Sequence, residues 1–169
     1  MTSALGSAQP TLFDVLSRRK SETSAFVWSA GAVIVFSALT ALLAQVRIGL
    51  VVKPVPMTGQ TFAVLLAGTA LGARRGAVSM ALDWLAGMGG PFGWYSNATH
   101  GWEVGSGATA GYMVGFILAA FAVGYLAEHG QDRNLLTSFS AMLVGTFIIY
   151  VVGVTWLAYK LDVPVFEGT

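Results

Sequence analysis

The sequence contains no cysteine, and only 10% of its 169 residues are charged. Without cysteine, the chain can form neither a disulfide framework nor a thiolate metal site. An ordinary soluble domain has about 25% charged residues, so that class is disfavoured as well. The chain also lacks a Gly-x-x-x-x-Gly-Lys-Ser/Thr motif, and it therefore cannot cradle nucleotide phosphates by that route.

Hydrophobic residues make up 55% of the chain and are gathered in long runs without charge. A helix of about 20 apolar residues spans the roughly 30 Å hydrocarbon core of a bilayer. Barrel strands would instead alternate over about 10 residues, whereas these runs are continuous and rich in Ala, Leu and Gly. The sequence predicts an all-α integral membrane protein, a bundle of about five transmembrane helices at residues 23–46, 57–73, 76–90, 104–127 and 135–159.

The charges between the runs predict an orientation. With a cytoplasmic N-terminus, the inner side receives six basic residues and the outer side three, as the positive-inside rule requires. The inner set is Arg18, Arg19, Lys20, Arg74, Arg75 and Arg133, and the outer set is Arg47, Lys53 and Lys160. Residues 1–22 are polar and are expected to form a mobile cytoplasmic tail before a transmembrane domain at 23–169.

Small residues recur at four-residue spacing in three of the runs. Such spacing lets helix backbones approach closely in a membrane, where apolar side chains gain little by leaving lipid. The positions are Gly107, Gly111, Gly115 and Ala119; Gly68, Gly72 and Gly76; and Ser37 and Ala41. Each set is explained either by packing inside the bundle or by contact with another subunit. Because the first span is free to lie on the outside, we expect Ser37 and Ala41 to face a partner.

Two polar segments, 47–60 and 91–107, lie on the outer side in this orientation. Trp94, Tyr95 and Trp102 are typical of an interfacial aromatic belt. Together with the nearby Ser96, Asn97, Thr99 and His100, they also resemble the lining of a small-molecule site, which combines aromatic walls with a few orienting polar groups.

Two acidic positions invite a functional interpretation. Asp83 lies within an apolar span, where an ionised carboxylate is costly and usually functional. The alternative places Asp83 near an interface, or pairs it with an arginine or a hydroxyl inside the bundle. His100 and Glu103 have the i, i+3 spacing of possible metal ligands, but two such residues in a loop containing glycine favour structural or solvated roles, and we predict no metal site.

Three blocks of the sequence resemble the BioY family. They are Pro-Val-Pro-Met-Thr-Gly-Gln-Thr at 54–61, Leu-Leu-Ala-Gly-Thr-Ala-Leu-Gly-Ala-Arg-Arg-Gly-Ala at 65–77 and Thr-Ala-Gly-Tyr-Met-Val-Gly-Phe at 109–116. The resemblance runs over most of residues 33–167. It implies the biotin-specific substrate-binding (S) component of an energy-coupling factor (ECF) transporter, which takes up the vitamin across the cell membrane.

The resemblance also implies partners. They are biotin as the transported ligand, a transmembrane coupling subunit and two cytoplasmic ATPases, with no cofactor and no nucleic acid. The family fold has six helices, and this sequence ends at Thr169, about where the sixth would begin. A fragment, a truncated product and a five-helix variant are all consistent with that, and without the sixth helix we expect weaker binding.

The candidate substrate-binding residues follow from the outer segments and the resemblance together. Pro54 and Pro56 keep the chain extended, which suits a loop folded over a site. Gln60 can both donate and accept hydrogen bonds, which suits the ureido group of biotin. The full predicted set is Gln60, Thr61, Asp83, Tyr95, Asn97 and Tyr112, with Gln60 and Asn97 as hydrogen-bonding groups and Tyr112 as an aromatic wall.

Other classes of function remain open from the residues alone. A membrane enzyme would need a convergent acid, base or nucleophile set, for which Asp83 with His100 is a thin candidate. A structural or assembly protein would explain the glycine spacing but not the polar segment at 91–107. An S component for another vitamin, such as thiamine or riboflavin, is the nearest alternative within transport. We predict a transport subunit, not an enzyme.

Overall fold

The computed structural model describes residues 10–17, 21–48, 57–90, 93–131 and 134–162, and most of this part of the chain is helical. The helices are α1 (Leu12–Ser17), α2 (Glu22–Ala44), α3 (Gln60–Leu71), α4 (Ala73–Gly89), α5 (Trp102–Gly105), α6 (Ala110–Glu128) and α7 (Leu135–Leu161). Two short strands, β1 (Arg47–Ile48) and β2 (Met57–Thr58), pair antiparallel, and Ser96–Ala98 form a single turn, η1.

The predicted fold class is confirmed, with five helices of at least 12 residues in the described part of the chain. Three of them are long and apolar enough to cross a membrane: Thr23–Ala44, Ala110–Glu128 and Leu135–Leu161. Two predicted starts were too early. The second long helix begins at Gln60, and the fourth begins at Ala110 because Trp102–Gly105 form the separate helix α5.

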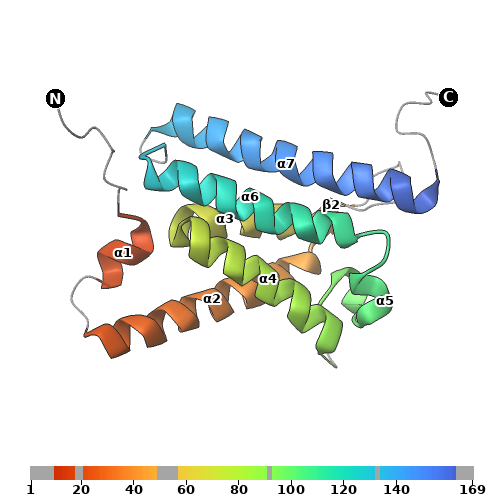
Figure 1. Cartoon of the computed structure of the whole chain (residues 1–169), viewed down its shortest axis with the longest axis horizontal. Helices are drawn as coiled ribbons and strands as arrows, with labels where there is room; N and C mark the ends of the chain where they lie inside the picture. Colours follow the sequence, from red (N-terminus) through yellow and green to blue (C-terminus); the bar gives the residue numbers. More distant parts are fainter. Residues whose placement is uncertain (1–9, 18–20, 49–56, 91–92, 132–133, 163–169) are drawn as a thin grey trace.

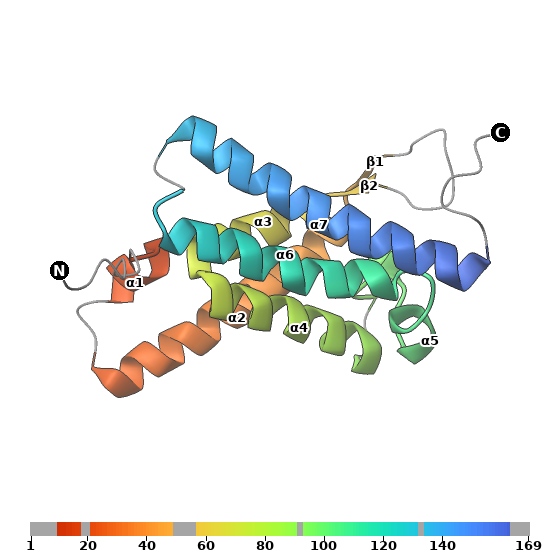
Figure 2. The same cartoon turned by 45° about the horizontal axis from the view of Figure 1, so that its top comes forward.

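The long helices run along the molecule in alternating directions (Figures 1 and 2). One end carries α1, the turn between α3 and α4, and the connection between α6 and α7. The opposite end carries the β1–β2 pair, α5 and the C-terminal end of α7. Helix α6 is central, since it packs against α3, α4 and α7.

Small residues bring the helix backbones close together. A Cβ built on Gly68 of α3 would lie 2.7 Å from the carbonyl oxygen of Ala120 in α6. A Cβ on Gly115 of α6 would lie 3.1 Å from the Cα of Ile149 in α7. These glycines therefore pack inside the bundle, one of the two explanations left open by their spacing.

Ser37 and Ala41 face inward, which contradicts their expected role as a partner surface. They are only 2% and 9% exposed. The same side of α2 meets α4, where Ser79 Oγ donates a hydrogen bond of 2.8 Å to the carbonyl oxygen of Val33. The outward side of α2 carries large apolar residues, including Trp28, Val35 and Leu42, as suits contact with lipid.

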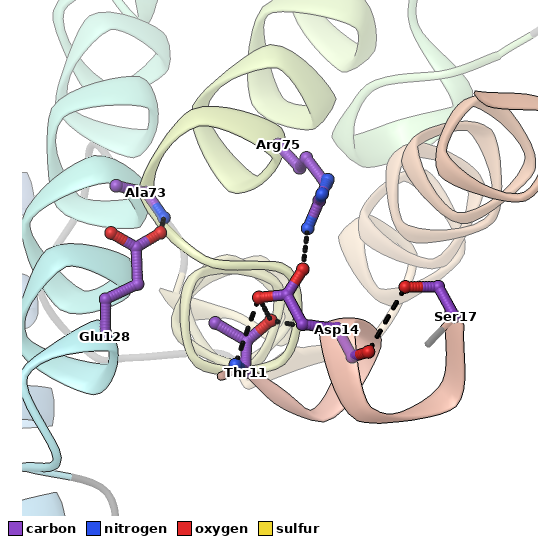
Figure 3. Close-up of polar contacts among 6 residues, drawn as sticks. All are labelled: Thr11, Asp14, Ser17, Ala73, Arg75 and Glu128. Atoms are coloured by element: carbon purple, nitrogen blue, oxygen red, sulfur yellow. Dashed lines mark hydrogen bonds and ion pairs between the residues drawn. The ribbon is translucent and has the colours of Figure 1, made fainter. Parts of the chain in front are cut away.

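The expectation of a mobile tail over residues 1–22 is wrong for its described part. Thr11 and Asp14 cap α1 reciprocally: the Thr11 backbone N–H donates to Asp14 Oδ2 over 3.1 Å, and the Asp14 backbone N–H donates to Thr11 Oγ1 over 3.4 Å. Arg75 at the start of α4 donates to Asp14 Oδ1 over 2.8 Å (Figure 3). Its guanidinium also covers the ring of the buried Phe13. This network attaches α1 to the bundle.

Asp14 gives the attachment of α1 a pH dependence. Burial alone would raise the pKa of the Asp14 carboxyl, but hydrogen bonds from Arg75 and Thr11 outweigh it and hold the pKa below its usual range. A lowered pKa in the folded state stabilises the fold above the unfolded value, and this contribution is lost as the pH falls through the folded value.

We expect Asp14→Asn to loosen α1 at neutral pH, because the variant cannot form the ion pair. The pair is more than one third exposed, so the effect should not exceed about 1 kcal/mol. Hydrogen exchange of the amides in α1 should be faster than in the parent at neutral pH. The ratio of the two exchange rates should begin to fall only below about pH 4 and should approach one as the pH falls through the lowered pKa, where the parent carboxyl protonates as well. Asp162→Asn, at an exposed position after α7, is the matched control. An undiminished ratio at low pH would show that charge is not what attaches α1.

Candidate functional site

A cavity of about 530 Å³ lies at the end of the bundle opposite α1, a size typical of small-molecule sites. It is enclosed by the start of α3, the segment 95–99, the first half of α6 and the middle of α7. The lining residues are Thr58, Gln60, Thr61, Tyr95, Ser96, Asn97, Thr99, Val104, Gly105, Thr109, Tyr112, Met113, Phe116, Ile149 and Tyr150.

Gln60 is the first residue of α3 and presents an unpaired donor. Its side chain is only 4% exposed, and its Oε1 accepts a hydrogen bond of 3.1 Å from Thr58 Oγ1. Its Nε2 is buried without a hydrogen-bond partner. Leaving such a group unpaired costs about 1–3 kcal/mol, so an unpaired buried donor in a cavity wall indicates a place for a ligand acceptor. The Ser96 hydroxyl, which also lines the cavity, is likewise buried and unpaired.

Local packing explains why Gln60 lies in the wall. The β1–β2 pair brings the chain back to the end of α2, where the Gly59 N–H donates 2.9 Å to the carbonyl oxygen of Val46. A Cβ on Gly59 would lie 3.0 Å from the carbonyl oxygen of Leu43, so glycine permits this close approach. Helix α3 then begins at once, with Gln60 at its first position.

Tyr95 anchors the segment that forms the opposite wall. It is 4% exposed, and its hydroxyl donates a hydrogen bond of 2.6 Å to the carbonyl oxygen of Trp84 in α4. Burial and the nearby Asp83 carboxylate raise the pKa of Tyr95 to about 12, so the phenol keeps its proton and remains a donor. The Tyr95 N–H also donates 2.9 Å to the carbonyl oxygen of Thr99, which closes a tight loop.

The remaining wall is aromatic and apolar. Tyr112 of α6 and Tyr150 of α7 meet edge to face, with ring centroids 6.4 Å apart. Met113, Phe116 and Ile149 continue the surface. The cavity therefore combines an aromatic and aliphatic side with a few polar groups, the usual composition of a site that orients a small organic molecule.

The structure brings five of the six predicted substrate-binding residues together around the cavity: Gln60, Thr61, Tyr95, Asn97 and Tyr112. That they contact a ligand stays a prediction. Pro54 and Pro56 lie outside the described residues.

Asp83 does not line the cavity. It is 1% exposed, and its Oδ1 accepts a hydrogen bond of 2.9 Å from Trp94 Nε1. We therefore assign it to holding Trp94, a partner the sequence did not suggest, and no longer to the substrate.

Several lining residues escaped the sequence analysis. Thr58 adjoins Gln60 in the Pro-Val-Pro block, and that position could have suggested it. Thr109 opens the block at 109–116 that carries the family resemblance, and that position could have suggested it too. Tyr150 carried no such signal, since it lies inside a long apolar run. His100 is exposed and is not a lining residue. Within the described ranges, His, Asp and Glu form no group of three or more that could hold a metal ion.

Comparison with known proteins places the chain in a family. A family model described as the BioY family matches residues 17–168. The chain belongs to this family. Among solved structures, the S-component for biotin from an ECF-type ABC transporter, a 2.1 Å crystal structure, is similar with a TM-score of 0.75. The alignment covers 86% of this chain and 79% of that one at 19% identity, which supports the shared fold.

Curated BioY-family relatives align with most of the chain. The biotin transporter BioY of Rhizobium etli is 39% identical over 125 residues, covering 69% of this chain and 65% of that protein. The biotin transporter BioY of Thermotoga maritima is 38% identical over 121 residues, covering 71% and 68%. The probable biotin transporter BioY of Pyrococcus horikoshii is 35% identical over 127 residues, covering 75% and 72%. The chain thus spans about two thirds of the length of these relatives.

Proposed function

We propose that the chain binds biotin as the S component of an ECF-type transporter. The observation that carries the proposal is the unpaired Nε2 of Gln60, buried in the wall of a cavity of about 530 Å³. The ureido group of biotin offers a carbonyl acceptor for such a donor and two N–H groups for nearby oxygens. The names of the relatives and the fold of the solved S-component support the same ligand.

The shape of the cavity suits the rest of the molecule. The sulfur-containing ring and the aliphatic chain of biotin are apolar, and they match the side formed by Tyr112, Met113 and Phe116. Burying such groups contributes about 25 cal/mol per Å² of apolar surface removed from water. The hydroxyls of Ser96 and Thr99 and the amide of Asn97 supply polar contacts at the other side.

Transport needs an energy source outside this chain, because the sequence has no P-loop. A transmembrane coupling subunit with two cytoplasmic ATPases would supply it. In the orientation of the positive-inside rule, the end with α1 and Arg75 would lie on the cytoplasmic side and the end with the cavity on the outer side. The chain would then capture biotin outside and release it inward when its partners act.

Calorimetry on the purified chain in detergent tests the proposal. Biotin should bind stoichiometrically without ATP, and thiamine and riboflavin should give no heat under the same conditions. Heat with thiamine or riboflavin and none with biotin would assign a different vitamin to the cavity. No heat with any of the three would contradict a role in capturing these vitamins.

A further inference from the structure

Gln45, the residue that follows α2, fastens the wall segment 93–99 from outside the cavity. Its Nε2 donates a hydrogen bond of 2.8 Å to the carbonyl oxygen of Tyr95 and one of 3.3 Å to that of Gly93. Its Oε1 accepts a hydrogen bond of 3.2 Å from the N–H of Ala98. One side chain thus joins both arms of the loop to the end of α2.

The tip of that loop has an unfavourable backbone conformation. Asn97 has φ 67° and Ala98 has φ 52°, in the left-handed region. Asparagine tolerates this region, whereas alanine adopts it at a cost because its Cβ crowds the carbonyl oxygen. A strained conformation persists where the surrounding structure holds it. The bond from the Ala98 N–H to Gln45 Oε1 is the contact that holds this tip from α2.

Only a carboxamide side chain can make this set of bonds. It must donate to backbone carbonyls with one atom and accept from a backbone N–H with another, which a carboxylate, an ammonium or an apolar group cannot do. The loop it fastens contributes Tyr95, Ser96, Asn97 and Thr99 to the cavity, whereas Gln45 itself does not line it.

We propose that Gln45 is a positioning residue for the ligand site, which fixes the loop tip so that Ser96 and Asn97 face the bound molecule. The expected effect of Gln45 on biotin affinity rests on the proposed function. The base of the loop has its own anchor, the bond from the Tyr95 hydroxyl to Trp84. Loss of Gln45 should therefore free the tip and leave the bundle intact.

Gln45→Met keeps the length of the side chain and removes every one of these hydrogen bonds. Biotin should bind about tenfold more weakly, the effect expected from losing a hydrogen bond and ordering a loop on binding. The thermal unfolding temperature should not change. Gln131→Met, an exposed glutamine in the connection that follows α6, is the matched control and should bind like the parent.

A second substitution separates positioning from general packing. Glycine adopts positive φ without strain, so Ala98→Gly should restore part of the affinity lost in Gln45→Met. If Gln45→Met weakens biotin binding by the same factor with and without Ala98→Gly, Gln45 does not act by holding the strained tip.

Hydrogen exchange without ligand separates failure of this proposal from failure of the proposed function. The Ala98 amide should exchange faster in Gln45→Met than in the parent, whether or not biotin binds. If the parent binds no biotin, the proposed function fails while this test of the loop still stands. Two results would overturn the role of Gln45. One is an Ala98 amide that exchanges at the same rate in Gln45→Met as in the parent, and the other is a parent that binds biotin no more tightly than Gln45→Met does.

Discussion

Replacing Gly68 with leucine should prevent the chain from folding. A Cβ at this position would lie 2.7 Å from the carbonyl oxygen of Ala120, 3.2 Å from the amide nitrogen of Gly124 and 3.3 Å from the Cα of Ala120. All three are backbone atoms of α6, and they cannot move aside as a flexible side chain could. Overpacking of this kind costs about 3 kcal/mol or more for a side chain as large as leucine. The measurement is the yield of monodisperse protein in detergent, with the thermal unfolding temperature of whatever is recovered.

Gly31→Leu is the matched control for this prediction. Gly31 lies in α2, it is exposed, and a Cβ built there meets nothing within 4 Å. The same change in volume should therefore leave the yield and the unfolding temperature close to those of the parent. If the yield and the unfolding temperature fall equally in both variants, leucine is destabilising in place of glycine in any helix of this chain. The close approach of α3 to α6 would then not explain the effect.

Replacing Gln60 with methionine should cost most of the affinity for biotin. Methionine keeps the approximate volume but cannot donate a hydrogen bond, so the ligand acceptor would be buried without a partner. That loss is worth about 1–3 kcal/mol, or roughly 5- to 150-fold in the dissociation constant. Calorimetric titration of the variant and the parent with biotin measures it.

The stability of the ligand-free protein distinguishes a binding role for Gln60 from a structural one. Gln60 Nε2 has no partner in the ligand-free protein, so Gln60→Met removes from the fold only the hydrogen bond that Oε1 accepts from Thr58 Oγ1, worth about 1 kcal/mol. The unfolding temperature should therefore fall only slightly, while the affinity for biotin falls by the larger factor given above. His100→Ala, at an exposed position that does not line the cavity, is the control and should bind like the parent. Equal affinity in Gln60→Met and the parent would place the ligand elsewhere.

The helices could be predicted from the sequence because charge is excluded from the hydrocarbon core. Uncharged runs therefore marked four of the long helices, a shorter run interrupted by Asp83 marked α4, and the polar segments at 47–60 and 91–107 marked the end that carries the cavity. The start of α6 was missed because the uncharged run begins at Val104, directly after Glu103, although the chain folds Trp102–Gly105 into the separate helix α5. The six residues of α1 are too few to establish a helical period, so its helix was missed too.

The contacts between segments distant in the sequence could not be predicted. Four-residue spacing marked Ser37 and Ala41 as points of close approach but could not say which helix approaches them. An acid in an apolar run pointed to a buried group at Asp83, whereas its partner Trp94 depends on how the chain after α4 folds back. Tyr150 resembles any aromatic residue facing lipid until α7 is packed against α6.

Hydrogen exchange with and without biotin tests the central claim most directly, because it reports where in the chain the ligand acts. Saturating biotin should protect the amides of Thr58–Thr61 and of the segment from Tyr95 to Met113, which form the walls of the cavity. The turn at Gly72 and the end of α6 near Glu128, at the other end of the molecule, should exchange as before. Protection confined to that other end, or no change anywhere, would contradict the assignment of this cavity to biotin.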